Sequence, residues 1–162
     1  MFTPPNILLI QKFDFEKEDA EPKDKFLIVL FQVGEDAIIA PLTTSQDYLP
    51  DYYKNKRCVK DDPSCIHCYY IPKALVIGRN GFAFIKDTYI HINPANLKRR
   101  SVLDLKKRYE ATGMASLKDA LTDAEYCDFL YCVYKSKHVP RGIRSAMEPI
   151  IGQLELKKAS QS

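Results

Sequence analysis

Short hydrophobic runs separated by polar turns dominate the first half of the chain. Residues 7–10 (Ile-Leu-Leu-Ile) and residues 26–31 (Phe-Leu-Ile-Val-Leu-Phe) are continuous apolar runs of strand length. Gly34, Glu35 and Asp36 then supply a turn, and residues 37–40 (Ala-Ile-Ile-Ala) return. The pattern therefore predicts a first strand followed by a hairpin over residues 25–42.

Further strands are expected before residue 94. The candidates are residues 68–71, 82–85 and 89–92, with a turn at residues 78–81 (Gly-Arg-Asn-Gly) ahead of the second. Residues 45–63 are polar and tyrosine-rich, which is typical of an excursion that carries at most a short helix. Short strands joined by turns favour an antiparallel barrel, because parallel strands need a crossover helix each time.

The pattern becomes helical after residue 94. Residues 102–109 hold helix formers, and Thr122 with Glu125 forms a capping box ahead of apolar residues at helical spacing up to Tyr134. A helical stripe follows Pro140, where Pro149 is expected to kink the helix or divide it in two, and the last residues are expected to fray. We therefore predict one α+β, mainly β domain, with a barrel core at about residues 5–93 and a helical part at about residues 94–157.

Composition and charge narrow the functional class only a little. The 162 residues are 46% hydrophobic and carry a net charge of +3, which permits a nucleic-acid partner without requiring one. No apolar run is long enough to span a membrane, and the N-terminus has no secretory signal, so we expect a soluble, cytoplasmic protein. Five cysteines, an odd number, favour reduced thiols.

Four segments of the chain share a pattern with one known family. They are the apolar run at residues 7–10, Lys23-Asp24-Lys25-Phe26 with the aliphatics after it, Pro41-Leu42-Thr43-Thr44-Ser45 at the end of the return strand, and residues 87–93. Residues 121–125 also match the start of that family's final helix. Over roughly residues 5–134 the chain thus resembles the MazF/PemK toxin endoribonucleases of bacterial toxin–antitoxin systems.

This resemblance implies a fold, partners and an activity. The fold would be a small SH3-like barrel with C-terminal helices, assembled as a homodimer, with a single-stranded RNA groove that an antitoxin protein can block. The activity would be metal-independent RNA cleavage that inhibits growth, with no cofactor. Such cleavage uses the 2′-hydroxyl as nucleophile, so the protein must transfer protons and stabilise charge on the phosphate.

The resemblance places Lys25, Thr43, Thr44 and Ser45 at the catalytic positions, with His91 as a secondary acid or base. Lys25 stands where the family has arginine. An ammonium contacts one phosphate oxygen at a time where guanidinium offers a planar fork, and it acts as a base only if its pKa falls from about 10.4. The alternative is structural: a solvated strand-edge lysine, a hydroxyl-rich turn and a half-buried histidine.

Two further groups of residues admit a functional interpretation. Cys58, Cys65, His67 and Cys68 include a Cys-x-x-Cys spacing and would suffice for one zinc, although strand alternation points Cys68 away from Cys65 and His67. Cys127 and Cys132 on the expected helix are interpreted as packing residues. The basic runs at residues 98–100 and 106–108 are either phosphate contacts or solvated helix faces.

Three functions remain open from the sequence. The first is an RNA-binding MazF/PemK-like toxin, active or without cleavage. The second is a catalytically inactive interaction module whose contact surface includes the tyrosines at residues 48–53. The third is zinc-assisted nucleic-acid binding through the cysteine cluster.

Overall fold

A computed structural model describes residues 1–14, 21–42, 56–61 and 66–161 of the chain. Its strands are β1 (Asn6–Phe13), β2 (Lys23–Val33), β3 (Asp36–Pro41), β4 (Cys58–Asp61), β5 (Ile66–Ile71), β6 (Thr88–His91), β7 (Lys98–Ser101) and β8 (Ala115–Ala120). Its helices are α1 (Val102–Leu105), the π-helical turn η2 (Lys106–Glu110), α2 (Asp123–Tyr134) and α3 (Arg141–Gln161). The chain is therefore α+β with more strands than helices among the described residues, as predicted.

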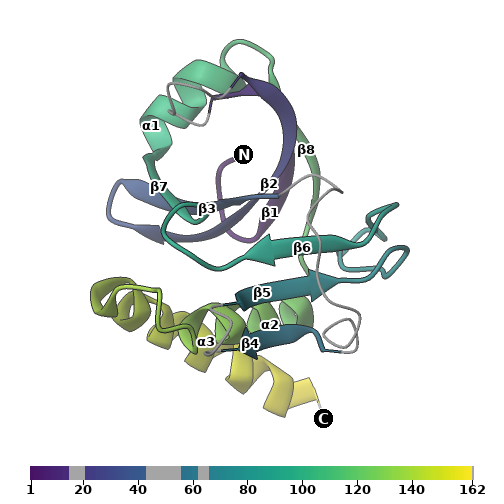
Figure 1. The fold of residues 1–162 in the computed structure, drawn as a ribbon, viewed down its shortest axis with the longest axis vertical. Helices are drawn as coiled ribbons and strands as arrows, with labels where there is room; N and C mark the ends of the chain where they lie inside the picture. Colours follow the sequence, from purple (N-terminus) through teal and green to yellow (C-terminus); the bar gives the residue numbers. More distant parts are fainter. Residues whose placement is uncertain (15–20, 43–55, 62–65, 162) are drawn as a thin grey trace.

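Five strands form one antiparallel sheet in the order β7-β3-β2-β1-β8. The predicted hairpin is confirmed: Leu27 lies opposite Pro41 and Val33 opposite Asp36, with Gly34 in the turn at a φ of +60°. The sheet is strongly curved and bends round the N-terminus (Figure 1).

Both faces of the central strands β1, β2 and β3 are buried, which explains their continuous apolar runs, whereas the edge strands β7 and β8 are polar. One face carries Leu8, Leu27 and Ile39, which pack with Phe2 and with Tyr109 of η2. The other face carries side chains such as Ile28, which pack against α2 and α3 in the larger core cluster. Because alternate side chains point to opposite faces, two cores require a hydrophobic residue at every position.

A second antiparallel sheet has the order β4-β5-β6 and lies beside α2 (Figure 1). Its Tyr69 ring contacts the Phe129 ring of α2, with ring centroids 4.8 Å apart. Ile71 and Ile90 join the same core cluster. Helices α2 and α3 therefore share one core cluster with both sheets.

The predicted boundary of the strand region at residue 93 is wrong. Strands β7 and β8 lie beyond it and form the two edges of the curved sheet, and β4 lies in the segment expected to be an excursion. The basic run at residues 98–100 is a strand and not a helix face, because its charges have partners there. Arg99 Nε donates to Asp36 Oδ2 of β3 at 2.8 Å, and the buried Arg100 guanidinium lies 5.6 Å from the Phe13 ring centroid.

The strand expected at residues 82–85 is also wrong. The turn at residues 78–81 is confirmed, since Gly81 N donates to Gly78 O at 3.1 Å and Ile77 N to Phe82 O at 2.9 Å. After it only one isolated bridge forms, between Val76 and Ala83. The segment from residue 72 to residue 87 is thus an irregular loop that projects between β5 and β6.

The two long helices follow the sequence closely. Thr122 caps α2, its hydroxyl accepting from Glu125 N at 3.2 Å. Helix α3 continues through Pro149 to Gln161, so the expected division at Pro149 is wrong. Met147, Ile151 and Leu154 lie in the core on both sides of the proline and hold the helix in one piece. Among the described helices, none has the length and apolar character needed to cross a membrane.

The prediction that the cysteines are reduced is wrong for two of them. Cys58 of β4 and Cys132 of α2 form a disulfide, whereas Cys68 and Cys127 are buried free thiols. Neither partner was predicted, because 74 positions separate them in the sequence and no local pattern pairs them.

Candidate functional site

A groove of about 440 Å³ opens where the hairpin of β2 and β3 meets the loop at residues 72–87. The hairpin contributes residues 24–26 and Leu42, and the loop contributes residues 82–87, with Thr88 of β6 at the end. Leu42 N donates to Phe26 O at 2.9 Å, which extends the hairpin pairing to the rim of the groove. The groove therefore contains Lys25, the position that the sequence resemblance marks for phosphate.

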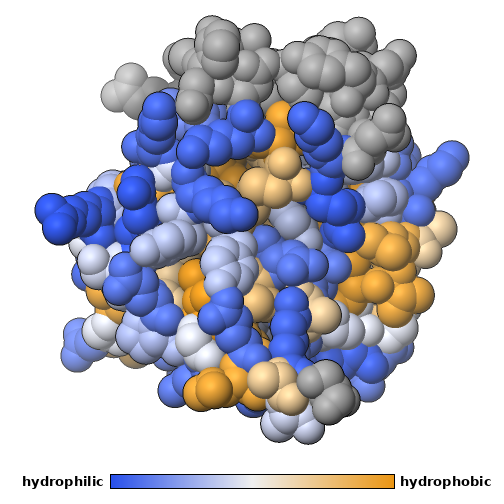
Figure 2. Space-filling model, turned by 90° about the horizontal axis from the view of Figure 1, so that it is seen from below, coloured by the Kyte–Doolittle hydropathy of each residue, from blue (hydrophilic) through white to orange (hydrophobic). Residues whose placement is uncertain are grey.

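Three aromatic rings form one wall of this groove. The centroid distances are 5.8 Å between Phe26 and Phe82, 5.3 Å between Phe26 and Phe84, and 5.0 Å between Phe82 and Phe84. Phe84 is buried, whereas Phe26 and Phe82 are half-buried and Ile85 is 89% exposed. The surface seen from the α3 side is mostly hydrophilic, with its largest hydrophobic area on the side where residues 72–87 project (Figures 1 and 2).

Two lysines and two aspartates supply the charge around the aromatic wall. Lys25 is half-buried and Lys86 is exposed. Asp24 accepts from Lys12 N at 2.9 Å, and Asp87 accepts from Tyr70 OH at 3.0 Å and from Lys73 N at 2.9 Å. Both carboxylates are therefore held by neighbouring backbone N–H groups or by a tyrosine hydroxyl. The groove thus combines aromatic faces with ammonium groups.

Asp119 of β8 fixes the turn that carries Phe82 into the groove. Its carboxylate accepts from Asn80 N, from Asn80 Nδ2 and, at 3.1 Å, from Phe82 N. A Cβ on Gly78 would lie only 2.1 Å from Asp119 Oδ2, so the carboxylate fits because residue 78 has no side chain. The position of Phe82 therefore depends on the buried carboxylate of Asp119, which lies on β8 at the edge of the curved sheet.

This hydrogen bonding gives the stability a pH dependence. Burial alone raises the pKa of Asp119, but the N–H donors of Ala120, Phe82 and Asn80 outweigh it, so the pKa lies below the ordinary value. The carboxylate's contribution is therefore complete above the unfolded-state pKa of about 3.9 and is lost as the pH falls through the folded-state pKa.

We expect Asp119→Asn to lower the free energy of unfolding by about 2 kcal/mol at neutral pH. The difference from wild type should narrow as the pH falls below about 4, because the wild-type carboxylate then becomes protonated. Urea unfolding at pH values on both sides of this range measures the effect. Asp128→Asn is the matched control, since its side chain is 58% exposed and its change should stay within about 0.5 kcal/mol. A constant difference across the pH range would contradict the assignment.

The other predicted catalytic residues are distributed as follows. Thr43, Thr44 and Ser45 lie outside the described residues, as do the tyrosines at residues 48–53. His91 lies on β6 opposite Cys68 and is not among the residues that line the groove. The sequence pattern predicts a strand at residues 82–85, so the aromatic wall was missed. The available signal was the spacing of Phe82, Phe84 and Lys86, which stand at every second position and all line the groove. Nothing in the local sequence around Asp119 signals its role.

The proposed zinc ligands do not form a common site among the described residues. Cys58 is bonded to Cys132, and Cys65 lies outside the described part of the chain. His67 packs its ring edge-on against His138 at 4.5 Å, whereas Cys68 belongs to a separate cluster with Val59. Within the described ranges, no three His, Cys, Asp or Glu side chains gather as metal ligands would.

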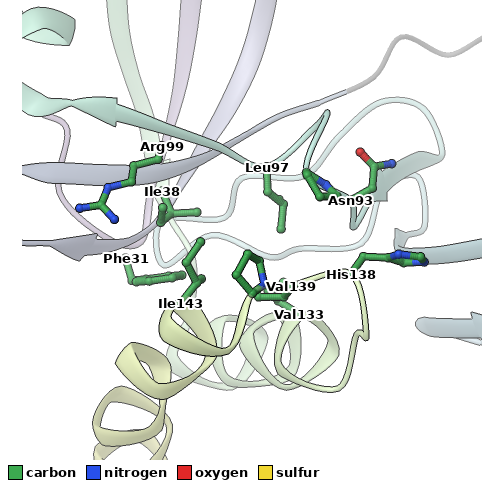
Figure 3. Close-up of a pocket in the computed structure, with 11 residues that line it drawn as sticks. Phe31, Ile38, Asn93, Leu97, Arg99, Val133, His138, Val139 and Ile143 are labelled. Carbon is green, nitrogen blue, oxygen red and sulfur yellow. The ribbon is translucent and has the colours of Figure 1, made fainter.

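A smaller pocket of about 100 Å³ lies between the curved sheet and the helices. Apolar side chains from the sheet and from the region of α2 and α3 point toward one another across it, with Arg99 and His138 at opposite ends (Figure 3). Its size and its apolar lining identify it as a packing gap rather than a binding site.

No known family model, no curated protein and no solved structure matches this chain. The groove and the motif resemblance are therefore the features of this chain that point to a function.

Proposed function

We propose that the chain binds single-stranded RNA in the groove between Lys25 and Phe82, as a MazF/PemK-like toxin of a toxin–antitoxin system. The observation that carries this proposal is the groove itself, in which aromatic faces lie beside ammonium groups at the end of the hairpin. The strongly curved sheet is consistent with the SH3-like barrel that the resemblance implies. A homodimer and an antitoxin partner belong to the same proposal.

The chemistry of the groove suits an unpaired RNA strand. Unpaired bases stack on aromatic rings, and each stacked base contributes about 1–3 kcal/mol. The half-buried rings of Phe26 and Phe82 offer such surfaces, while Lys25 and Lys86 are placed to contact phosphates. A duplex keeps its bases stacked inside, so this groove favours single strands.

Cleavage requires more than binding. In this proposal Lys25 stabilises the charge on the phosphate, and the hydroxyl of Thr43 assists the 2′-hydroxyl attack, as the family pattern implies. Lysine holds the phosphate through one ammonium, so turnover should be slower than with an arginine at this position. If the assay below finds no cut RNA, the chain binds RNA without cleaving it.

We expect Phe82→Leu to weaken binding to a labelled single-stranded RNA of mixed sequence by about tenfold, because the apolar volume remains and the stacking surface is lost. Lys25→Ala should weaken binding severalfold and reduce the salt dependence by about one counterion. Fluorescence anisotropy over a salt series measures both effects. Lys107→Ala is the matched control, since Lys107 is an exposed lysine of η2 away from the groove, and it should bind as wild type.

The same variants test the toxin activity. Expression of the wild-type chain should arrest bacterial growth and cut a mixed RNA pool, and Lys25→Ala or Thr43→Ala should relieve both effects. Harmless expression with RNA binding intact would leave a binding protein without cleavage. If the wild-type chain binds no RNA, the proposal is wrong and the apolar groove is better explained as the surface of a protein interaction module.

A further inference from the structure

A third pocket, of about 320 Å³, is lined by the small sheet and α2 and contains both cysteines of the disulfide. Its lining residues come from β4, β5, α2 and the positions next to them, and they include both cysteines, Arg57, Asp128 and Lys135. Cys58 is half-buried, whereas Cys132 is only 3% exposed. Of the two bonded cysteines, Cys58 is therefore the residue more exposed to a reagent that enters the pocket.

Two cationic side chains, Arg57 and Lys135, line this pocket together with the disulfide. Arg57 is held in place by its Nε, which donates to Tyr70 O at 2.6 Å, and by its Nη2, which donates to Tyr69 OH at 3.2 Å and contacts Glu125. Lys135 caps the C-terminal end of α2, three positions after Cys132, and its ammonium lies 5.6 Å from the Tyr131 ring centroid.

The acidic groups of this pocket have cationic partners of their own. Glu125 is buried against Arg57 and Tyr69, and together with burial it raises the pKa of the Tyr69 phenol, so Tyr69 stays neutral. Asp128 Oδ1 lies 3.7 Å from Lys158 Nζ. Since Arg57 is paired with Glu125 and Asp128 lies near Lys158, Lys135 supplies the remaining positive charge that the pocket presents to a small anionic molecule.

The other described cysteines do not compete for such a reagent. Burial raises the pKa of Cys68 to about 11, and Cys127 is buried with its pKa also raised by burial. Thiols of this kind carry little thiolate and are poor nucleophiles.

We propose that Cys58 is a modification site, at which a small thiol carrying carboxylates opens the Cys58–Cys132 disulfide and remains attached as a mixed disulfide. This inference does not depend on the RNA proposal. It follows from the greater exposure of Cys58 and from the positive charge of Lys135 in the same pocket.

The exchange is balanced without any other reagent. The thiolate of the small molecule attacks Cys58 Sγ, forming one new S–S bond while the bond to Cys132 breaks with its electron pair. Cys132 leaves as a thiolate, which Lys135 stabilises until the sulfur takes a proton from water. Helix α2 then loses its covalent bond to β4, and Glu125 with Arg57 and Tyr69 remains as the polar link between the helix and the small sheet.

The test uses the full chain, with accessible free thiols first blocked by iodoacetamide so that only the disulfide can react. Glutathione, an anionic thiol, is compared with cysteamine, a cationic thiol, at equal thiolate concentration. We expect glutathione to form a mixed disulfide about tenfold faster, with the adduct mapped to Cys58 by mass spectrometry of peptides. Lys135→Gln, a change at an exposed side chain, should reduce this preference severalfold.

Three outcomes would overturn the proposal. The first is an adduct that maps to Cys132, which would mean that the buried sulfur is attacked. The second is equal rates for the two thiols, which would remove the role of the cations. The third is exchange seen only in urea, which would show that the folded chain protects the bond.

Discussion

Gly78→Ala is expected to lower the free energy of unfolding by about 2–4 kcal/mol and to weaken RNA binding in the groove. The new Cβ would lie 2.1 Å from Asp119 Oδ2 and 2.7 Å from Phe82 Cβ. The carboxylate cannot move aside cheaply, because it accepts hydrogen bonds from Asn80 and from Phe82 N. Either these hydrogen bonds break or the turn at residues 78–81 shifts. Both changes displace Phe82 from the aromatic wall.

Urea unfolding and RNA anisotropy on the same preparations measure this prediction. Gly142→Ala is the matched control, since a Cβ there meets nothing within 4 Å and alanine favours the helix, so stability should rise by up to about 1 kcal/mol. If Gly78→Ala matched Gly142→Ala in stability, the close fit between the turn and Asp119 would be wrong. A stability loss with unchanged RNA binding would instead separate the turn from the groove's function.

The hairpin and the capped helix were predictable because their signals are local. The apolar runs at residues 26–31 and 37–40 and the turn at Gly34 lie within twenty residues and define one pairing. Thr122 and Glu125 likewise identify the start of α2 within four residues. Patterns of this kind depend only on neighbouring residues, and the structure reproduces them.

The edge strands β7 and β8 were not predictable in the same way. The polar run Lys98–Ser101 is a strand because β3 pairs with it and Asp36 compensates Arg99, and neither fact can be read within the run. Strand β8 pairs with β1, more than a hundred positions earlier. Long-range pairing of this kind overrides the local preference of each segment.

The candidate site shows the same division. Lys25 is predicted because a motif marks it, and it lines the groove. The aromatic wall and Asp119 were missed, because the three rings come from two distant segments and the carboxylate from a third. A site assembled from three segments gives no single pattern to recognise.

Loss of the disulfide is expected to have the largest effect on stability. Cys58 and Cys132 are 74 positions apart, so their bond restricts a long loop in the unfolded chain and stabilises the native state by about 4 kcal/mol. Cys132→Ala should therefore lower the free energy of unfolding by roughly this amount. The loop includes the groove segment at residues 72–87, so the aromatic wall should lose order at lower urea concentrations as well.

Urea unfolding with and without an excess of dithiothreitol measures this effect. Reductant should destabilise the wild-type chain to the level of Cys132→Ala and leave that variant unchanged. Cys58→Ala and the double variant should show the same loss as Cys132→Ala, because all three remove one bond and the effects cannot add. Additive losses, or a wild-type chain indifferent to reductant, would mean that the two cysteines stabilise the fold separately by packing. Agreement of the three variants would instead assign the loss to the covalent link between β4 and α2.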